Sequence, residues 1–153
     1  MSGNPDFIFY KRSRFTTRLP LDRLYTAAHF WMRPLEDQTY EVGMTRFAVR
    51  MLGDMVEADF EVKPGDAVRE GQIIGWIEGM KAAADLYSAM DGLFVTGNPD
   101  ILADIERVRK EPYAAGWLYK LSGQPPATAV DAQGYELILN ETIDRIEGEY
   151  TDE

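Results

Sequence analysis

The chain has 153 residues and a formal net charge of −10, from 26 acidic and 16 basic side chains. This length suits one domain that folds without disulfides or a structural metal, and no apolar run is long enough to span a membrane. The negative charge would repel a phosphate backbone, so we expect neither nucleic acid nor a membrane as a partner. Cysteine is absent and His29 is the only histidine. Thiol catalysis, Cys-ligated zinc and a two-histidine relay are therefore excluded, and the sequence predicts no catalytic or metal site.

Residues 1–18 form an N-terminal extension with a short basic run at Lys11, Arg12, Arg14 and Arg18. The apolar stretch before this run is too short for a secretory signal, and the segment lacks the amphipathic helix of a transit peptide. We therefore expect a cytoplasmic protein. Charge runs are usually solvated, so we expect a solvated arm here, with a docking site as the alternative.

The middle of the chain has the pattern of short strands separated by glycines. We expect strands at Phe30–Arg33, Tyr40–Met44, Met55–Glu61, Gln72–Glu78, Ala84–Ser88, Gly92–Gly97 and Trp117–Leu121. Two helices should interrupt them. Thr45 can cap a helix that runs to Leu52, and Asn98-Pro99-Asp100 can begin another that runs to Val108. These patterns predict a mostly β domain with short helices.

The C-terminal segment, residues 124–153, begins with a break at Gln124-Pro125-Pro126 and ends in an acidic tail. Apolar residues between them recur near helical spacing. They are Tyr135, Leu137, Ile138, Ile143 and Ile146. We expect an amphipathic helix over residues 135–147 that packs on the same domain, because so short a helix is marginal without a surface to bury against. A helix that docks on a partner is the alternative.

Turn sequences place Lys81 near the tip of a hairpin. Lys63-Pro64-Gly65-Asp66 is typical of a chain reversal, and the apolar strand Ile73–Ile77 is followed by another strand around Leu86-Tyr87. A hairpin between these two strands has Gly79-Met80-Lys81-Ala82 near its tip. On the residues alone, an exposed lysine there is most simply a solubilising side chain.

The segment Glu78-Gly79-Met80-Lys81-Ala82 resembles the lipoyl-attachment hairpin of lipoate-carrying domains. That signature has a glutamate three residues before the lysine, a glycine about ten residues before it, and often an alanine after it. The resemblance implies that a lipoate-attaching enzyme joins lipoate to Lys81 and recognises a turn formed by Glu78, Gly79, Met80 and Ala82. We expect the small residues to leave room for that enzyme. Biotinyl domains carry methionine on both sides of the lysine, and only Met80 fits that pattern.

Further motifs, in order along the chain, resemble those of the glycine cleavage system H proteins. They are Tyr25–Trp31, Val42–Ala48, Leu52–Asp54, Glu111–Leu118 and Asp131–Leu139. This resemblance covers about residues 19–140 and implies an H-protein-like lipoyl domain over residues 19–123. Its fold would be a β-sandwich of the lipoyl and biotinyl type, a barrel-sandwich hybrid, with flanking helices. The resemblance implies a non-catalytic carrier whose arm on Lys81 moves a group between partner enzymes. We expect His29, Trp31 and Trp117 to be structural.

Several positions depart from the H-protein pattern. Gly79 and Met80 replace a serine and a valine, Val108-Arg109-Lys110-Glu111 replaces an N-x-D pair, and both ends are extended. These departures resemble the H-like lipoate-binding proteins of the heterodisulfide-reductase-like system of sulfur oxidisers. We therefore expect the arm to carry sulfur between partner oxidoreductases of that system. The aminomethyl carrier of a glycine cleavage complex is the alternative, and an unmodified scaffold is the second.

The residues that shield the arm are not apparent from the sequence. Glu57, Asp59 and Tyr87 are candidate neighbours of the arm.

Overall fold

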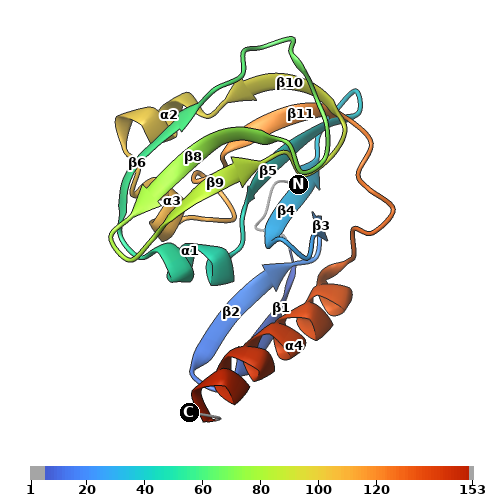
Figure 1. Cartoon of the computed structure of the whole chain (residues 1–153). Coiled ribbons are helices and arrows are strands. Elements are labelled where there is room, and N and C mark those ends of the chain that lie inside the picture. Colours follow the sequence, from blue (N-terminus) through green and yellow to red (C-terminus); the bar gives the residue numbers. More distant parts are fainter. Residues whose placement is uncertain (1–5, 152–153) are drawn as a thin grey trace.

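Two antiparallel sheets face each other across the main hydrophobic core in the computed structural model, which describes residues 6–151 (Figure 1). The larger sheet has the order β3-β4-β5-β11-β10-β7 and the smaller β6-β8-β9. The larger contains β3 (Leu24–Tyr25), β4 (Phe30–Pro34), β5 (Thr39–Met44), β7 (Ala67–Val68), β10 (Gly92–Gly97) and β11 (Tyr119–Gly123). The smaller contains β6 (Met55–Phe60), β8 (Ile73–Gly79) and β9 (Ala83–Tyr87). All seven expected strands therefore form, and the fold is the expected mostly β sandwich.

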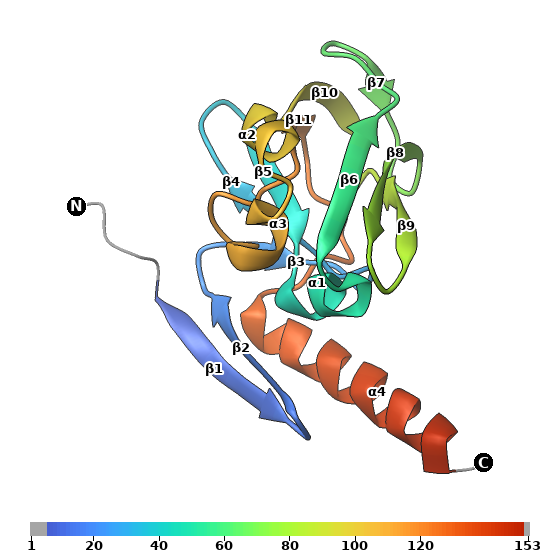
Figure 2. The same ribbon diagram turned by 90° about the vertical axis from the view of Figure 1, so that its left-hand side faces the viewer.

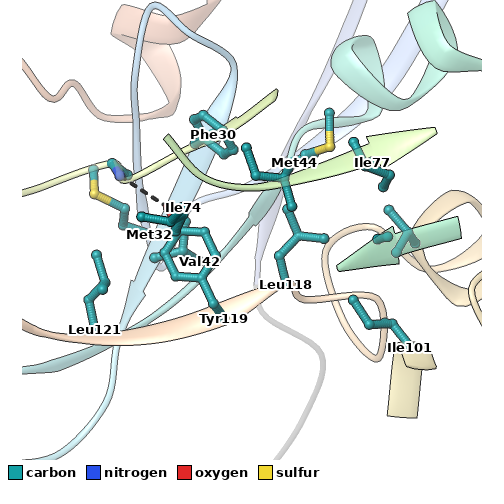
Figure 3. Close-up of a cluster of buried hydrophobic side chains, with 14 of the residues drawn as sticks. Phe30, Met32, Val42, Met44, Ile74, Ile77, Ile101, Leu118, Tyr119 and Leu121 are labelled. Carbon is teal, nitrogen blue, oxygen red and sulfur yellow. Dashed lines mark hydrogen bonds between the residues drawn. The ribbon is translucent and has the colours of Figure 1, made fainter. Parts of the chain in front are cut away.

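The core between the sheets is filled by alternate residues of their strands. Side chains from both sheets meet there, including Met32, Val42, Ile74, Ile77 and Leu121 (Figure 3). The buried Tyr119 hydroxyl accepts a hydrogen bond from the Ala89 N–H and donates one to the Tyr87 carbonyl, both at 3.0 Å. Its polar atom is thus satisfied inside an apolar core.

Three short helices flank the sandwich. Helix α1 (Arg46–Leu52) begins as expected at Thr45, whose hydroxyl accepts a hydrogen bond from the Ala48 N–H. The single helix expected from Asn98 to Val108 is wrong, because α2 (Pro99–Ala103) ends at Asp104 and α3 (Arg107–Lys110) follows as a separate turn. Both pieces turn apolar residues into the same core. Apolar spacing is the same for two short turns as for one helix, so it could not reveal the break.

The N-terminal segment is a β-hairpin. Strands β1 (Phe7–Arg12) and β2 (Phe15–Pro20) pair along their whole length, and Ser13-Arg14 form the turn. Alternate side chains of the hairpin, among them Phe15 and Leu19, are buried. The expectation of a solvated arm is therefore wrong for the backbone and for one face of the hairpin. Three of its basic side chains, Lys11, Arg14 and Arg18, are exposed as expected.

Helix α4 (Ala132–Thr151) packs against this hairpin and against the larger sheet (Figure 2). It is longer than the expected helix over residues 135–147. The Tyr135 ring stacks on Tyr25 with 4.9 Å between ring centroids, and Leu139 and Ile143 are buried in the same cluster. Within residues 6–151, no helix is long and apolar enough to cross a membrane. A cytoplasmic location stays a prediction.

Candidate functional site

Lys81 lies at the exposed tip of the hairpin that β8 and β9 form, as expected. Glu78 is paired with Ala83, and the Gly79 N–H donates to the Ala82 carbonyl at 2.9 Å. The local pairing therefore closes the hairpin directly below Met80 and Lys81. Met80 is 75 % exposed, and Glu78 and Ala82 are also exposed, so these three side chains are accessible to an approaching protein.

The tip is held by hydrogen bonds to a distant segment of the chain. The Met80 N–H donates to the Asp54 carbonyl at 2.7 Å, and the Lys81 N–H donates to the Leu52 carbonyl at 2.9 Å. Leu52 is the last residue of α1, where carbonyl groups have no partner within the helix. The hairpin tip thus supplies the missing donors, and the main chain of Lys81 has a fixed position.

Two glycines permit this close approach. A Cβ atom on Gly79 would lie 2.1 Å from the Leu52 carbonyl oxygen, so the buried Gly79 has a role inside the protein. We expected Gly79 to leave room for a modifying enzyme, whereas it leaves room for the end of α1. Gly53 has a φ of +77°, and a Cβ atom there would lie 2.9 Å from Cγ of Lys81. The methylene stem of Lys81 therefore crosses directly over Gly53.

The motif Leu52-Gly53-Asp54 is thus part of the site. In the sequence it stood out only as one of the H-protein-like motifs, without a role. In the structure each of its residues contacts the tip. The carbonyls of Leu52 and Asp54 accept hydrogen bonds from it, and Gly53, which has no side chain, leaves room for the stem of Lys81. No local pattern could have revealed these contacts, because they join segments about 27 residues apart.

The expected neighbours of the arm are only partly near it. Glu57 is paired with Glu78, close to the tip. Asp59 is paired with Trp76, further along β8, and Tyr87 with Ile73 at the opposite end of the hairpin. At about 3.3 Å per residue, six residues of strand separate Tyr87 from the tip by roughly 20 Å. The expectation that Tyr87 is a neighbour of the Lys81 arm is therefore wrong.

Two cavities open beside Lys81. The first has a volume of about 380 Å³ and lies between β2, α1 and α3, with three arginines, Arg46, Arg50 and Arg109, in its lining. The second has a volume of about 400 Å³ and lies between the turn of the β1–β2 hairpin, α1 and α4. Lys81 lines both, so a group attached to its amine can enter either one.

The arginines give the first cavity a positive character in an acidic protein. Arg109 pairs with Asp54 at 3.1 Å and with Glu106 at 2.7 Å. Burial alone would raise the pKa of Glu106, but the Met55 N–H and the Arg109 guanidinium hold that pKa below its ordinary value. Arg46 donates to the Arg109 carbonyl at 2.6 Å. Among residues 6–148, whose side chains are described, no carboxylate lies within ion-pair distance of Arg46 or Arg50.

His29 is structural, as expected. Its Nδ1 is 2.7 Å from the Tyr135 hydroxyl, which is 2.8 Å from the hydroxyl of Thr45. Burial lowers the pKa of His29 to about 4. A neutral imidazole in this partly buried chain of hydrogen bonds joins α4, the start of α1 and the β3–β4 turn. It lines neither cavity beside Lys81.

Comparison with known proteins agrees with this arrangement. The family described as glycine cleavage H-protein matches residues 23–142. The glycine cleavage system H protein of Alteromonas mediterranea is 38 % identical over 128 residues, which cover 82 % of this chain and 98 % of that protein. The one from Shigella dysenteriae is 36 % identical over 129 residues, with the same coverage.

The solved structures include a similar protein. The crystal structure of a glycine cleavage system H protein from Mycobacterium marinum superimposes with a TM-score of 0.69 and 33 % identity, and covers 76 % of this chain and 95 % of that one. The family match, the two relatives and the shared fold all point the same way. The chain therefore belongs to the glycine cleavage H-protein family and is, like its members, a non-catalytic carrier subunit with a lipoyl-type β-sandwich.

Proposed function

We propose that this protein is a lipoyl carrier whose lipoate is joined by an amide bond to Lys81, and that it serves a glycine cleavage system. The observation that carries this proposal is the geometry of Lys81. Its side chain is exposed at a hairpin tip, while its main chain is fixed by the hydrogen bond to Leu52. A modifying enzyme needs an accessible amine in one position, and the tip offers this. Gly53, over which the methylene stem of Lys81 passes, leaves room for an attached chain.

The residues of this chain position the arm and leave its chemistry to the attached group. Lipoate supplies a cyclic disulfide that opens to two thiols, one of which can hold a transferred group. The lysine methylenes, the amide and the acyl chain give a reach on the order of 12–14 Å from the fixed Cα atom of Lys81. The net charge of −10 favours docking on basic faces of partner enzymes. The partners we propose are a lipoate-attaching enzyme and the enzymes of the glycine cleavage complex.

The relatives named above favour an aminomethyl cargo, which was our alternative expectation, over the sulfur cargo that we expected first. They give no support to sulfur oxidation. A sulfur carrier is kept as a second candidate because of one observation, the positive cavity at Arg46 and Arg50 beside Lys81. Arginine side chains attract an anionic sulfur group and repel the cationic amine of an aminomethyl group.

Intact-mass measurement and peptide mapping test the attachment of lipoate. The protein is produced with a lipoate ligase, and the Lys81→Arg variant is the matched control. We expect a lipoyl adduct on Lys81 alone, and no adduct on the variant. An unmodified Lys81 in the presence of an active ligase would contradict the proposal and favour the unmodified scaffold.

The cargo is tested with the lipoylated protein in both redox states. With the arm oxidised to the ring disulfide, the protein is incubated with glycine and the decarboxylating enzyme of a glycine cleavage system, because the disulfide is the oxidant: CO2 leaves, one sulfur takes the aminomethyl group and the other becomes a thiol. With the arm reduced to the dithiol, the protein is incubated with a sulfane-sulfur donor and a sulfur-oxidising reductase complex. The mass of the arm is then measured. We expect an aminomethyl adduct, and a sulfur adduct alone would establish the second candidate instead.

A further inference from the structure

The outer edge of the N-terminal hairpin is a regular strand that is open on one side. Among residues 6–151, strand β1 pairs only with β2, and Figure 2 shows β1 on the outer side of the hairpin. The pairing has no bulge, and β1 contains neither proline nor a charged residue before Lys11. Proteins usually protect open edges with such features, because an open edge can pair with another chain. The edge of β1 is therefore a template for an added strand.

Alternate main-chain groups of β1 face this open edge. The Leu21 N–H donates to the Asp6 carbonyl at 2.8 Å, so the polar groups of Asp6 face β2. In an antiparallel pair, residues whose main chain bonds to the partner strand alternate with residues whose main chain points away from it. The N–H and carbonyl groups that point away from β2 are thus those of Phe7, Phe9 and Lys11. In agreement, the residue paired with Phe7 is a proline, which has no N–H.

The side chains along the edge are aromatic and basic. Phe7 is 47 % exposed and Phe9 is 63 % exposed. Arg18 of β2 is paired with Phe9, and its guanidinium carbon lies 5.1 Å from the centroid of the Phe7 ring. Lys11 is exposed on the same face. In the part of the chain whose side chains are described, no carboxylate lies within ion-pair distance of Lys11 or Arg18. The edge is thus a positive strip on a protein with a net charge of −10.

We propose that the open edge of β1 binds an extended, acidic segment of a partner protein by strand addition. Main-chain hydrogen bonds to the three outward-facing residues hold the segment. Acidic side chains of the segment pair with Lys11 and Arg18, and an apolar side chain between them covers Phe9. Complementary charge also speeds the encounter, because the rest of this acidic chain repels such a segment everywhere else.

This inference goes beyond the carrier function and does not require lipoate on Lys81. The edge precedes residue 23, where the match to the H-protein family begins, so this binding belongs to the N-terminal extension. The hairpin turn that follows β1 lines the second cavity together with Lys81. A partner docked along β1 is therefore held next to the carrier lysine.

A second copy of this chain fits the edge less well than an acidic partner. Residues 7–20 contain no acidic side chain. Two β1 strands paired through their open edges would therefore bring only basic side chains together on the exposed face, and each copy carries a net charge of −10. Residues 1–5 also contain no acidic side chain, so they cannot supply the missing charges.

Titration with a short peptide tests the site on the full chain. The probe is acetyl-Glu-Thr-Val-Thr-Glu-amide, whose alternate residues place two carboxylates and one valine on one face of a strand. We expect the amide NMR signals of Phe7, Phe9 and Lys11 to shift saturably and their hydrogen exchange to slow, while the signal of the remote Ile105 stays. No saturable shift up to about 10 mM peptide would overturn the proposal.

Two control peptides separate charge from strand addition. In one, lysine replaces both glutamates, and in the other, proline replaces the valine and removes the central N–H. We expect both to bind several-fold more weakly than the probe. Equal binding of the lysine peptide would overturn an acidic partner, and equal binding of the proline peptide would overturn strand addition.

Two variants locate the site on the protein. Lys11→Glu and Lys63→Glu change the net charge equally, and both lysines are exposed, but Lys63 lies in the turn before β7. We expect Lys11→Glu to weaken peptide binding several-fold, and Lys63→Glu to bind like the parent. Equal weakening in the two variants would mean that only the overall charge matters, and would overturn the site.

Two further measurements test the other occupants. Sedimentation velocity of the full chain should show a monomer, and the chain should not pellet with vesicles of anionic phospholipid. A dimer in which hydrogen exchange is slowed at Phe7, Phe9 and Lys11 would assign the edge to a second copy instead. Pelleting with vesicles that Lys11→Glu abolishes would assign it to a membrane. Either result would overturn the proposal, whereas failure of lipoylation changes none of these measurements.

Discussion

Because Gly79 has no side chain, the hairpin tip that carries Lys81 can lie directly against the end of α1. A hydrogen atom of Gly79 faces the Leu52 carbonyl, where a methyl group would lie 2.1 Å from the oxygen. We expect Gly79→Ala to push the hairpin tip away from α1, to lower the free energy of unfolding by about 1–3 kcal/mol, and to slow the modification of Lys81. Urea denaturation and the rate of lipoylation measure the two effects.

Gly148→Ala is the control for this prediction. A Cβ atom at Gly148 meets no other atom within 4 Å, and alanine favours a helix over glycine by about 1 kcal/mol. This variant should be as stable as the parent or slightly more stable, with an unchanged rate of modification. A Gly79→Ala protein that behaved in the same way would contradict the close approach described here.

His29 makes stability depend on pH. Burial lowers its pKa to about 4 in the folded protein, from 6.5 in a free histidine. Between these values the unfolded chain binds a proton that the folded protein does not, so stability falls as the pH is lowered through this window. The total loss should be on the order of 3 kcal/mol, and it should be complete near pH 4.

The variant His29→Asn tests this assignment. His29 has a φ of 69°, and asparagine tolerates this left-handed conformation better than most residues. We expect urea denaturation between pH 7 and pH 4 to show a smaller loss of stability for the variant than for the parent. Parallel losses would mean that other groups cause the pH dependence.

At the scale of elements, the hairpin of β1 and β2 is held by its apolar face. The ion pair of Arg12 with Asp144 is partly exposed, and such pairs contribute less than about 1 kcal/mol. Leu19 is fully buried between the hairpin and α4, so Leu19→Ala should cost about 2–5 kcal/mol. Urea denaturation of Leu19→Ala and Arg12→Gln compares the two. A larger loss for Arg12→Gln would show that the charges hold the hairpin instead.

Elements with local signals could be predicted from the sequence. The seven strands, the cap at Thr45 and the tip at Lys81 all depend on turn residues and on periodicity within a few positions. The hairpin of β1 and β2 was missed, although Phe15, Thr17 and Leu19 alternate with polar residues as in a half-buried strand. Its basic residues suggested a solvated arm, whereas Lys11 and Arg18 occupy the exposed face of paired strands and Arg12 pairs with Asp144 of α4.

The arrangement around Lys81 could not be predicted in the same way. Asp54 and Leu52 reach the tip because β6 pairs with β8, and that pairing brings the end of α1 beneath the hairpin. The cavities depend on α3 and α4, which are distant in sequence from Lys81. Periodicity describes which face of an element is apolar, but not which elements meet.

At the scale of the whole molecule, the larger sheet separates two hydrophobic clusters. Phe30 and Met32 of β4 face the core between the sheets, and Trp31 between them points to the opposite face. Trp31 is fully buried there, and its N–H donates to the carbonyls of Met44 and Pro112. The opposite residue on β5 is Gly43, where a Cβ atom would lie 2.4 Å from the indole ring. The hairpin and α4 thus cover a face that would otherwise expose aromatic rings.

The fixed tip has a consequence for the encounter with partner enzymes. Because the main chain of Lys81 is tied to α1, a lipoyl arm attached there would move only through the bonds of its own chain. Its end would then explore roughly a hemisphere of 13 Å radius, whose volume corresponds to an effective concentration of about 0.4 M at a docked active site. A tip that moved freely would enlarge this volume with the cube of the radius. Anchoring the hairpin would therefore keep the end of the arm concentrated at the active site of a docked enzyme.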